Sequence, residues 1–376
     1  MAGASDFSCF YAAGKMVDSG DGSRIYDRAA QCDAQRPFYG RVDTHKLPLP
    51  FVFVPFILAI FAPLALLAYS YSLTLWYAVN ACLLISVPFL LRRRLRMTDK
   101  QLSPAILASS LFLPSSISLG QGQPTILALV LFTLVFLDLG NGQATRAGCL
   151  LALTTFKPQF ALPLLLALML TRNWKAVAGF VSTCIALLGV SAAIAGWRTT
   201  LSFPRAVAEF SAASGKMDGE HVLSMPNLRG FLYFLLDPRL SRNELDLIAM
   251  AASALVVLIV LWLVFSNCRH ISDLQFALII VVTLLVSFHS YGHDLILLLL
   301  PFFLVASYIG RHELTYRRMA IAMVAGVLLI LPSMLLPPQI TVIVAALFLV
   351  ALITEILHPN AFDATHGFPE LKPSLK

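Results

Sequence analysis

The sequence is dominated by long apolar runs, many of them close to the length of a membrane-spanning helix, separated by short polar turns. A helix needs about 20 apolar residues to cross a bilayer, and it satisfies its own backbone hydrogen bonds there. A membrane β-barrel would need alternating apolar and polar residues, which these runs lack. The candidate spans are Phe51–Tyr69, Leu73–Leu91, Leu102–Leu119, Thr125–Leu139, Ala147–Leu170, Ala176–Ala195, Leu247–Phe265, Leu274–Phe288, Leu295–Ile309, Met319–Leu336 and Ile340–Ile356.

The composition supports the same class of protein. Of 376 residues, 58% are hydrophobic and 12% charged, whereas a soluble domain carries about 25% charged residues. We therefore predict an all-α polytopic membrane protein, a bundle of roughly ten transmembrane helices in the plasma (inner) membrane. The net charge of +7 comes partly from short basic loops such as Arg92–Arg96. Such loops are typical of the cytoplasmic side of a membrane and do not indicate nucleic-acid binding.

Two polar stretches interrupt this pattern. Residues 1–49 are expected to form an N-terminal loop at the outer face, and residues 196–246 a second outer-face loop. The second loop is rich in aromatic residues among charges, which favours short helices lying on the membrane surface over disorder. Residues 50–195 and 247–357 then hold the membrane helices, and residues 358–376 form a polar tail.

The topology is in conflict at one point. The basic loop from Arg172 to Lys175 looks cytoplasmic, which puts the loop of residues 196–246 outside. Counting candidate spans back from Arg172 then puts the basic cluster Arg92–Arg96 outside as well. We therefore expect at least one candidate between Leu102 and Leu139 not to cross fully.

The cysteines show no spacing pattern. Cys82, Cys149 and Cys184 lie in apolar runs and are expected to fill the core. Cys9 and Cys32 share the N-terminal polar stretch and could pair if that stretch faces an oxidising compartment.

The first candidate functional residue is Asp6. Phe7, Phe10, Tyr11 and Met16 can share one face of a helix that Asp6 precedes, and a carboxylate is stabilised at that positive helix end. The alternative is that Asp6 is only a helix N-cap.

The second candidate is the polar turn Gly120–Thr125 between two apolar runs. Its glycines permit unusual backbone angles, and Pro124 suits the first turn of a following helix. Gln121 and Gln123 supply neutral donors and acceptors of the kind that bind sugar hydroxyls. The alternative is a plain chain reversal.

The third candidate is Lys157, in the middle of an apolar run and followed by Pro158. Pro158 interrupts the helix, and a lysine at the bilayer centre costs about 2.5–3.5 kcal/mol, so it normally faces a cavity or a partner. An anionic group such as a lipid phosphate would fit. The alternative is a lysine that extends along the helix to the membrane surface.

The fourth candidate is the junction Phe288–Asp294 between two apolar runs. His293 and Asp294 could transfer protons or bind sugar hydroxyls, and with His289 they could also hold a metal. The alternative is two histidines at the membrane interface, with Asp294 capping the next helix. In the long loop, Asn227 and Arg229 add an amide and a guanidinium at the same face.

Taken in order, these motifs resemble glycosyltransferase family 87. Asp6 to Tyr11 and Tyr26-Asp27 resemble the first outer loop of that family, and the proline-containing stretch from Leu47 to Leu64 resembles the family's next segment. The resemblance extends over nearly the whole chain.

The later motifs continue the resemblance to this family. Gly120–Gln123 resembles the family's Gly-Gln-x-Asn motif, and Phe156–Gln159 its Lys-Pro segment. Pro226–Gly230 is similar to its lumenal Asn-x-Ser-x-x-Gly stretch, and His293–Pro301 to its junction before an outer-face helix. The sequence departs from the family pattern at Gln123-Pro124, where an Asn-bearing helix start is usual, and at Ser287-Phe288, where Ser-Pro is usual. The family also places a spanning helix before the carboxylate, whereas Asp6 stands almost at the start of this sequence, so that helix is either upstream of Met1 or absent.

The resemblance implies a GT-C-like bundle with an outer-face active site, no cofactor and no metal. It also implies inverting transfer of a sugar, typically mannose, from a polyprenyl-phosphate-sugar donor to a lipid or glycan acceptor. Asp6 stands at the position of the general base. The residues expected to bind the donor or acceptor are Tyr11, Gln121, Gln123, Lys157, Gln159, Asn227, Arg229, His293 and Asp294.

The alternative function is a transporter or lipid flippase. A transporter is expected to show paired halves with broken helices at matching positions. Here no repeat is visible, and the polar motifs gather at one face.

Overall fold

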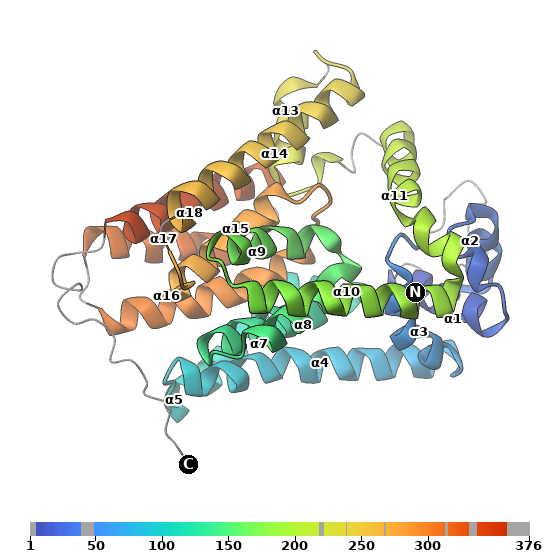
Figure 1. Ribbon diagram of the computed structural model, residues 1–376, viewed down its shortest axis with the longest axis horizontal. Helices are drawn as coiled ribbons and strands as arrows, with labels where there is room; N and C mark the ends of the chain where they lie inside the picture. The colour runs from blue at the N-terminus through green and yellow to red at the C-terminus, as the bar shows by residue number, and fades with distance from the viewer. Residues whose placement is uncertain are drawn as a thin grey trace.

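The computed structural model describes residues 5–38, 49–217, 222–237, 239–266, 268–312, 315–330 and 337–358. All regular elements within these ranges are helices (Figure 1). The predicted polar tail lies outside the described residues apart from His358, as does the end of the Met319–Leu336 candidate.

The α-helices are α1 (Phe7–Asp18), α2 (Arg28–Gln35), α3 (Leu58–Ala65), α4 (Tyr69–Arg94), α5 (Asp99–Leu111), α6 (Leu113–Gln121), α7 (Thr125–Gly140), α8 (Ala144–Leu153), α9 (Pro158–Leu170), α10 (Trp174–Ala195), α11 (Trp197–Met217), α13 (Leu228–Leu236), α14 (Arg242–Phe265), α15 (Asp273–Val286), α16 (Leu299–Arg311), α17 (Tyr316–Ile330) and α18 (Pro338–Leu357). Short 3₁₀ helices include η3 (Pro55–Ile57), η4 (Thr154–Phe156) and η5 (Asp294–Leu298).

The chain is a multi-pass helical membrane protein, as predicted. Among the described residues, five helices are long and apolar enough to span a bilayer, namely α4, α10, α14, the continuous unit of η5 with α16, and α18. α5 and α6 are bent by 57° and make a sixth span if counted together. The other apolar candidates form helices too, but shorter ones, such as α7, α9 and α15. The expected ten or so apolar segments are therefore present, but only about half are full-length spans.

One predicted span, Ala147–Leu170, is instead a helical hairpin. α8 leads up to the 3₁₀ turn η4, the backbone at Lys157 leaves the helical region (φ −120°, ψ 84°), and Pro158 begins α9. Near the start of α8, the backbone of Thr145 lies so close to Gly179 that a Cβ there would be 2.2 Å from the Thr145 carbonyl oxygen. Just after α9, Thr171 lies beside Asn173, which caps α10. Both ends of the hairpin are thus at one end of the molecule.

This hairpin removes the topological conflict. Because α8 and α9 run in opposite directions, the loops at Arg92–Arg96 and at Arg172 come to the same end of the bundle without any change between Leu102 and Leu139. Arg94, for example, lies against Gly140 at the end of α7, where a Cβ would be 3.1 Å from its Nε. Between Leu102 and Leu139 no candidate forms one long straight span, because α5 and α6 are bent by 57° and α7 is one of the shorter apolar helices. The agreement of the two basic loops does not depend on this, since it follows from the hairpin.

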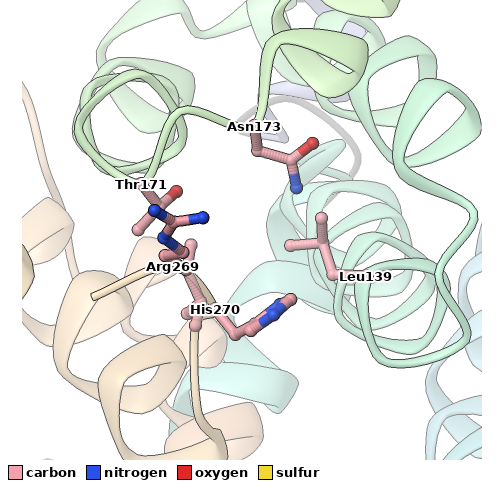
Figure 2. A pocket seen from close by; sticks show the side chains of 6 residues that line it. Leu139, Thr171, Asn173, Arg269 and His270 are labelled. Atoms are coloured by element: carbon pink, nitrogen blue, oxygen red, sulfur yellow. The ribbon is translucent and has the colours of Figure 1, made fainter.

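We call this end of the bundle, which carries Arg92–Arg96, Arg172, Arg269 and Arg311, the basic end. Asp273 there accepts ion pairs from Arg94 (2.8 Å) and Arg311 (3.1 Å), which tie α15 to α4 and α16. A small pocket between the helix ends is lined by Leu139, Thr171, Asn173, Arg269, His270 and Ile271 (Figure 2). In Figure 1, α1 to α3 and α11 gather at the opposite end, far from α5.

The N-terminal segment is an integral part of that opposite end. α1 buries its predicted face of Phe7, Phe10, Tyr11 and Met16, as expected. It packs so closely on α3 that a Cβ at Gly14 would lie 2.7 Å from the Phe61 carbonyl oxygen.

The remaining polar stretches are helical too. The loop of residues 196–246 contains α11 and α13, and its last residues already belong to α14, which begins at Arg242. Cys9 and Cys32 are both free thiols, so the possible pairing is not formed.

Candidate active site

The tip of the α8–α9 hairpin carries a buried ion pair. Lys157 Nζ donates to Asp294 Oδ1 at 2.5 Å, and the two residues are 8% and 1% exposed. A lysine at the membrane surface would be hydrated, so the alternative interpretation of Lys157 was wrong. Buried charges persist when they are paired and hydrogen-bonded. The pair joins the hairpin to the start of η5, 137 residues further along the chain.

Asp294 is fixed by further donors. Thr125 Oγ1, at the start of α7, lies 3.2 Å from its Oδ1, and the backbone N–H of Tyr291 donates to Oδ2 at 3.0 Å. The carboxylate therefore turns back toward the preceding loop instead of capping the following helix. Its charge is compensated, which suits a role in holding Lys157 in place.

His293 links this ion pair to the polar turn Gly120–Thr125, which we call the glutamine turn. Its Nδ1 lies 2.7 Å from Gln121 Oε1, and its Nε2 lies 3.3 Å from Lys157 Nζ. Because a carboxamide oxygen only accepts, Nδ1 carries the proton and Nε2 accepts from the ammonium. Burial lowers the pKa of His293 to about 4. The imidazole is therefore neutral near pH 7.

The glutamine turn also brings the side-chain amide of Gln123 into hydrogen-bonding contact with Asp6. Gln121 ends α6, Gly122 adopts a left-handed conformation (φ 68°), and Gln123 Nε2 donates to Asp6 Oδ2 at 2.6 Å. A Cβ at Gly122 would lie 2.7 Å from Phe7 Cβ, so only glycine allows the turn to approach α1 this closely. Pro124 precedes α7 as its N-cap residue and does not lie in its first turn.

Asp6 is the carboxylate of the cluster that lacks a cation. Asp6 occupies the N-cap position of α1, but its side chain makes no cap bond to the helix and accepts from Gln123 instead, so it is more than a helix N-cap. Within the described residues no ion pair to Asp6 is seen, whereas Asp294 has one. Burial raises the pKa of Asp6, although the hydrogen bond from Gln123 acts in the opposite direction. A partly buried carboxylate with a raised pKa is a stronger base than an ordinary surface aspartate.

Three further side chains donate hydrogen bonds to the backbone of the glutamine turn, and the sequence analysis did not identify them. Tyr77 Oη donates to the carbonyl of Gly120 (3.1 Å), Ser5 Oγ to that of Gln121 (2.9 Å) and Trp76 Nε1 to that of Gly122 (2.8 Å). With three successive carbonyls held, the turn keeps one orientation. Trp76 and Tyr77 were missed because aromatic residues are ordinary in a membrane helix.

The loop between α15 and η5 is also held by contacts from Asn227 and Arg229. Asn227 donates from Nδ2 to the carbonyl of Ser287 (2.8 Å) and caps α13 by accepting from the N–H of Gly230 (2.8 Å). Arg229 pairs with Asp246 at 2.8 Å, and its guanidinium lies 3.9 Å from the ring centre of Phe288. These residues support the loop and are not part of the hydrogen-bonded cluster around Lys157.

The remaining predicted residues lie around this arrangement. Gln159 Nε2 is 3.4 Å from the carbonyl of His289, whose own pKa is lowered to about 4, mainly by burial. The hydroxyl of Tyr11 donates to the carbonyl of Leu67 (2.7 Å), between α1 and the end of α3.

The structure thus brings six of the predicted residues into one cluster, places three at its margin and puts Tyr11 in the N-terminal core. Within the described residues, no group of three His, Cys, Asp or Glu side chains could hold a metal ion. The six clustered residues are Asp6, Gln121, Gln123, Lys157, His293 and Asp294.

The comparison with known protein families decides what kind of site this is. The model of glycosyltransferase family 87 matches residues 51–288, which is more than half of the chain. The chain belongs to glycosyltransferase family 87. No curated relative and no solved structure matches it.

The family 87 match includes the glutamine turn, the hairpin tip with Lys157 and the Asn227 segment. Asp6 precedes the matched residues, and His293 and Asp294 follow them. Asp6 and His293 are hydrogen-bonded to the glutamine turn, through Gln123 and Gln121, so they belong to the same cluster in space. This family 87 chain is therefore a membrane glycosyltransferase whose polar cluster is its candidate active site.

Proposed function

We propose that this protein transfers a hexose, mannose by the resemblance of its motifs, from a polyprenyl-phosphate-sugar donor to a lipid or glycan acceptor, with inversion at the anomeric carbon. Asp6 is the general base. The observation that carries this assignment is the division between the two carboxylates: Asp294 is neutralised by Lys157, whereas Asp6 has only the amide of Gln123 and a raised pKa.

The chemistry needs one proton transfer and one substitution. Asp6 takes the proton of an acceptor hydroxyl, and the oxygen attacks the anomeric carbon. The bond from that carbon to the phosphate oxygen breaks, and the phosphate leaves with the electron pair. General-base catalysis of this kind contributes about 10²- to 10⁴-fold.

Lys157 is suited to the leaving phosphate. The three N–H donors of its ammonium face Asp294 (2.5 Å), His293 (3.3 Å) and Thr125 (3.4 Å). A phosphate oxygen would take the place of the long contact to Thr125 while the contacts to Asp294 and His293 remain. The preorganised cation would stabilise charge that develops on the phosphate oxygen in the transition state. Neutral His293 and Gln121 hold the ammonium and the turn in place without adding negative charge.

The depth of the cluster supports a lipid-linked substrate. α7 and α9 begin at the cluster and α15 ends just before its loop, and they contain 16, 13 and 14 residues. At 1.5 Å per residue they span about 20–24 Å, less than the roughly 30 Å of a hydrocarbon core. Their shortness favours a cluster recessed below the membrane surface, where a lipid phosphate can reach it.

The orientation follows from the basic end. Positive loops remain in the cytoplasm, so the opposite end with Asp6 is expected at the outer face. This orientation supports a site that uses donors presented in the outer leaflet of the plasma membrane.

The test is sugar transfer by the purified protein from labelled polyprenyl-phosphate-mannose to a lipid extract. We expect transfer with the lipid-linked donor and none with a nucleotide-linked sugar. A protein that transfers no sugar from any lipid-linked donor, but moves such lipids between the leaflets of a vesicle, would contradict this function and support a flippase.

A further inference from the structure

The pocket at the basic end is formed by three connections that lie far apart in the chain. They are the turn between α9 and α10 with Thr171 and Asn173, the segment between α14 and α15 with Arg269 and His270, and the end of α7 with Leu139 (Figure 2). The pocket encloses about 50 Å³, whereas a single water needs about 10–15 Å³. It therefore has room for a small polyatomic group.

The side chains around the pocket offer hydrogen-bond donors to such a group. The side-chain oxygen of Asn173 accepts from the N–H of Ala176 (3.4 Å), and its amide nitrogen points into the pocket (Figure 2). In the described part of the chain, neither this amide nitrogen nor the guanidinium of Arg269 has an acceptor. Both are free to donate to a ligand.

The positive charge of the pocket is not compensated by a carboxylate. The two acidic residues that adjoin its lining residues in the sequence are engaged elsewhere. Asp138 accepts from Arg146 Nε at 2.6 Å, and Asp273 is held by the arginines from α4 and α16. No ion pair to Arg269 is seen among the described residues. The pocket therefore selects an anion.

The donors present are those that phosphate binds well. A guanidinium donates two parallel N–H bonds to phosphate oxygens, and these charge-assisted bonds are stronger than neutral ones. The amide of Asn173 adds a donor from the opposite side of the pocket. Arg269 and Asn173 can thus hold one phosphate group between them.

The surroundings of the pocket indicate that this phosphate belongs to a lipid. Leu170 and Trp174, which stand on either side of the turn between α9 and α10, are 43% and 58% exposed although both are apolar. Tryptophan is typical of the headgroup level of a membrane, and basic pockets between helices at the cytoplasmic side bind anionic headgroups. Hydrocarbon chains attached to a phosphate in the pocket would lie beside Leu170 and Trp174.

We propose that this pocket binds the phosphate group of an anionic phospholipid in the leaflet at the basic end. The bound phosphate ties the turn before α10 to the segment before α15, as Asp273 ties α15 to α4 and α16. The pocket is separate from the polar cluster, because the 13 residues of α9 place Thr171 about 20 Å from the hairpin tip. The inference therefore does not depend on the proposed function.

The first experiment measures the binding of phosphatidylglycerol to the purified full-length protein by native mass spectrometry. Arg269→Gln removes the cation of the pocket. Arg93→Gln, the matched control, removes the same charge from an exposed position at the basic end that does not line the pocket. We expect Arg269→Gln to weaken binding by about tenfold and Arg93→Gln to change it little. An equal loss in both variants would show diffuse attraction to the basic end and overturn the proposal.

The second experiment uses a variant that keeps the fold. Asn173→Asp retains the oxygen that caps α10, and its negative charge suits the start of a helix. The same charge repels a phosphate in the pocket. We expect the Tm of the lipid-free protein to be maintained and the binding of phosphatidylglycerol to be lost. Binding at the wild-type affinity would overturn the proposal.

The third experiment separates a lipid phosphate from a free one. Inorganic phosphate and phosphatidylcholine are titrated against bound phosphatidylglycerol in the wild-type protein. We expect phosphatidylcholine, which has no net charge, and inorganic phosphate, which has no hydrocarbon chain, each to compete at least tenfold more weakly than phosphatidylglycerol itself. Competition by inorganic phosphate with equal affinity would assign the pocket to a free anion and overturn the lipid assignment.

Discussion

Gln123 donates a 2.6 Å hydrogen bond to the carboxylate of Asp6, which lies 117 residues earlier in the chain. The bond connects the glutamine turn between two apolar helices to the start of an N-terminal helix. It also acts on the chemistry, because a donor to an ionised carboxylate lowers its pKa. Burial thus raises the pKa of Asp6, and the hydrogen bond from Gln123 lowers it.

Removal of this amide should shift the pH dependence of the reaction. In Gln123→Met, Asp6 loses the bond that favours its ionised form, so its pKa rises further. We expect the acid limb of kcat/KM to move to higher pH. The control is Gln143→Met, an exposed glutamine at the basic end. An unchanged acid limb would contradict the assignment of Asp6 as the titrating base.

Loss of the Trp76 hydrogen bond should also change the pH dependence, because this bond holds the turn from which Gln123 reaches Asp6. Trp76→Phe keeps an aromatic ring but removes the donor to the Gly122 carbonyl, which loosens the turn that carries Gln123. We expect a lower kcat and an acid limb that moves in the same direction as in Gln123→Met. Trp262→Phe, at an exposed position on α14, should leave both unchanged. A loss of protein stability without a shift of the acid limb would reduce Trp76 to a packing residue.

The Lys157–Asp294 pair should show asymmetric effects on stability and activity. Lys157→Met leaves the buried Asp294 without a counter-charge, which costs about 3–5 kcal/mol of unfolding free energy. The double variant Lys157→Met/Asp294→Asn removes both charges and should regain most of that stability. Thermal unfolding in detergent measures this difference. Transfer activity should be lost in both variants, and full activity in the double variant would exclude Lys157 from the reaction.

The lowered pKa values of His289 and His293 predict acid sensitivity of the fold. Burial lowers the pKa of His289 and of His293 to about 4, below the ordinary value of 6.5. As the pH falls, these histidines therefore become protonated at a higher pH in the unfolded chain than in the folded one. The stability that they contribute above pH 6.5 is lost as the pH falls toward 4.

Replacement of both residues by glutamine should flatten the dependence of Tm on pH in that interval. The control is His270→Gln, at an exposed position at the basic end. An equally steep decline in the double variant would contradict the assigned protonation states.

The sequence predicted the polar motifs well, for a physical reason. In a chain this apolar, each polar group within a membrane helix carries a large energetic cost, so residues such as Lys157 and Gln121 are exceptions that can be recognised without a structure. The pairing of Lys157 with Asp294 could not be predicted, because it depends on how segments 137 residues apart pack together.

The hairpin was missed for a different reason. Hydropathy alone does not distinguish one long span from two short helices that reverse at a point. Pro158 indicated the break, but a proline also occurs in helices that are merely kinked. The reversal is decided by the close approach of α8 to α10, where Gly148 and Gly179 leave no room for a side chain. The small residues at those two positions were an available signal for that approach.

The central claim is that Asp6 removes the proton from the acceptor, and Asp6→Asn tests it most directly. Asparagine keeps the size of the side chain and can still accept the hydrogen bond from Gln123, so the fold and donor binding should be retained. We predict that kcat for sugar transfer falls by about 10²- to 10⁴-fold, with an unchanged KM for the donor. Transfer by Asp6→Asn at the wild-type rate would contradict the account.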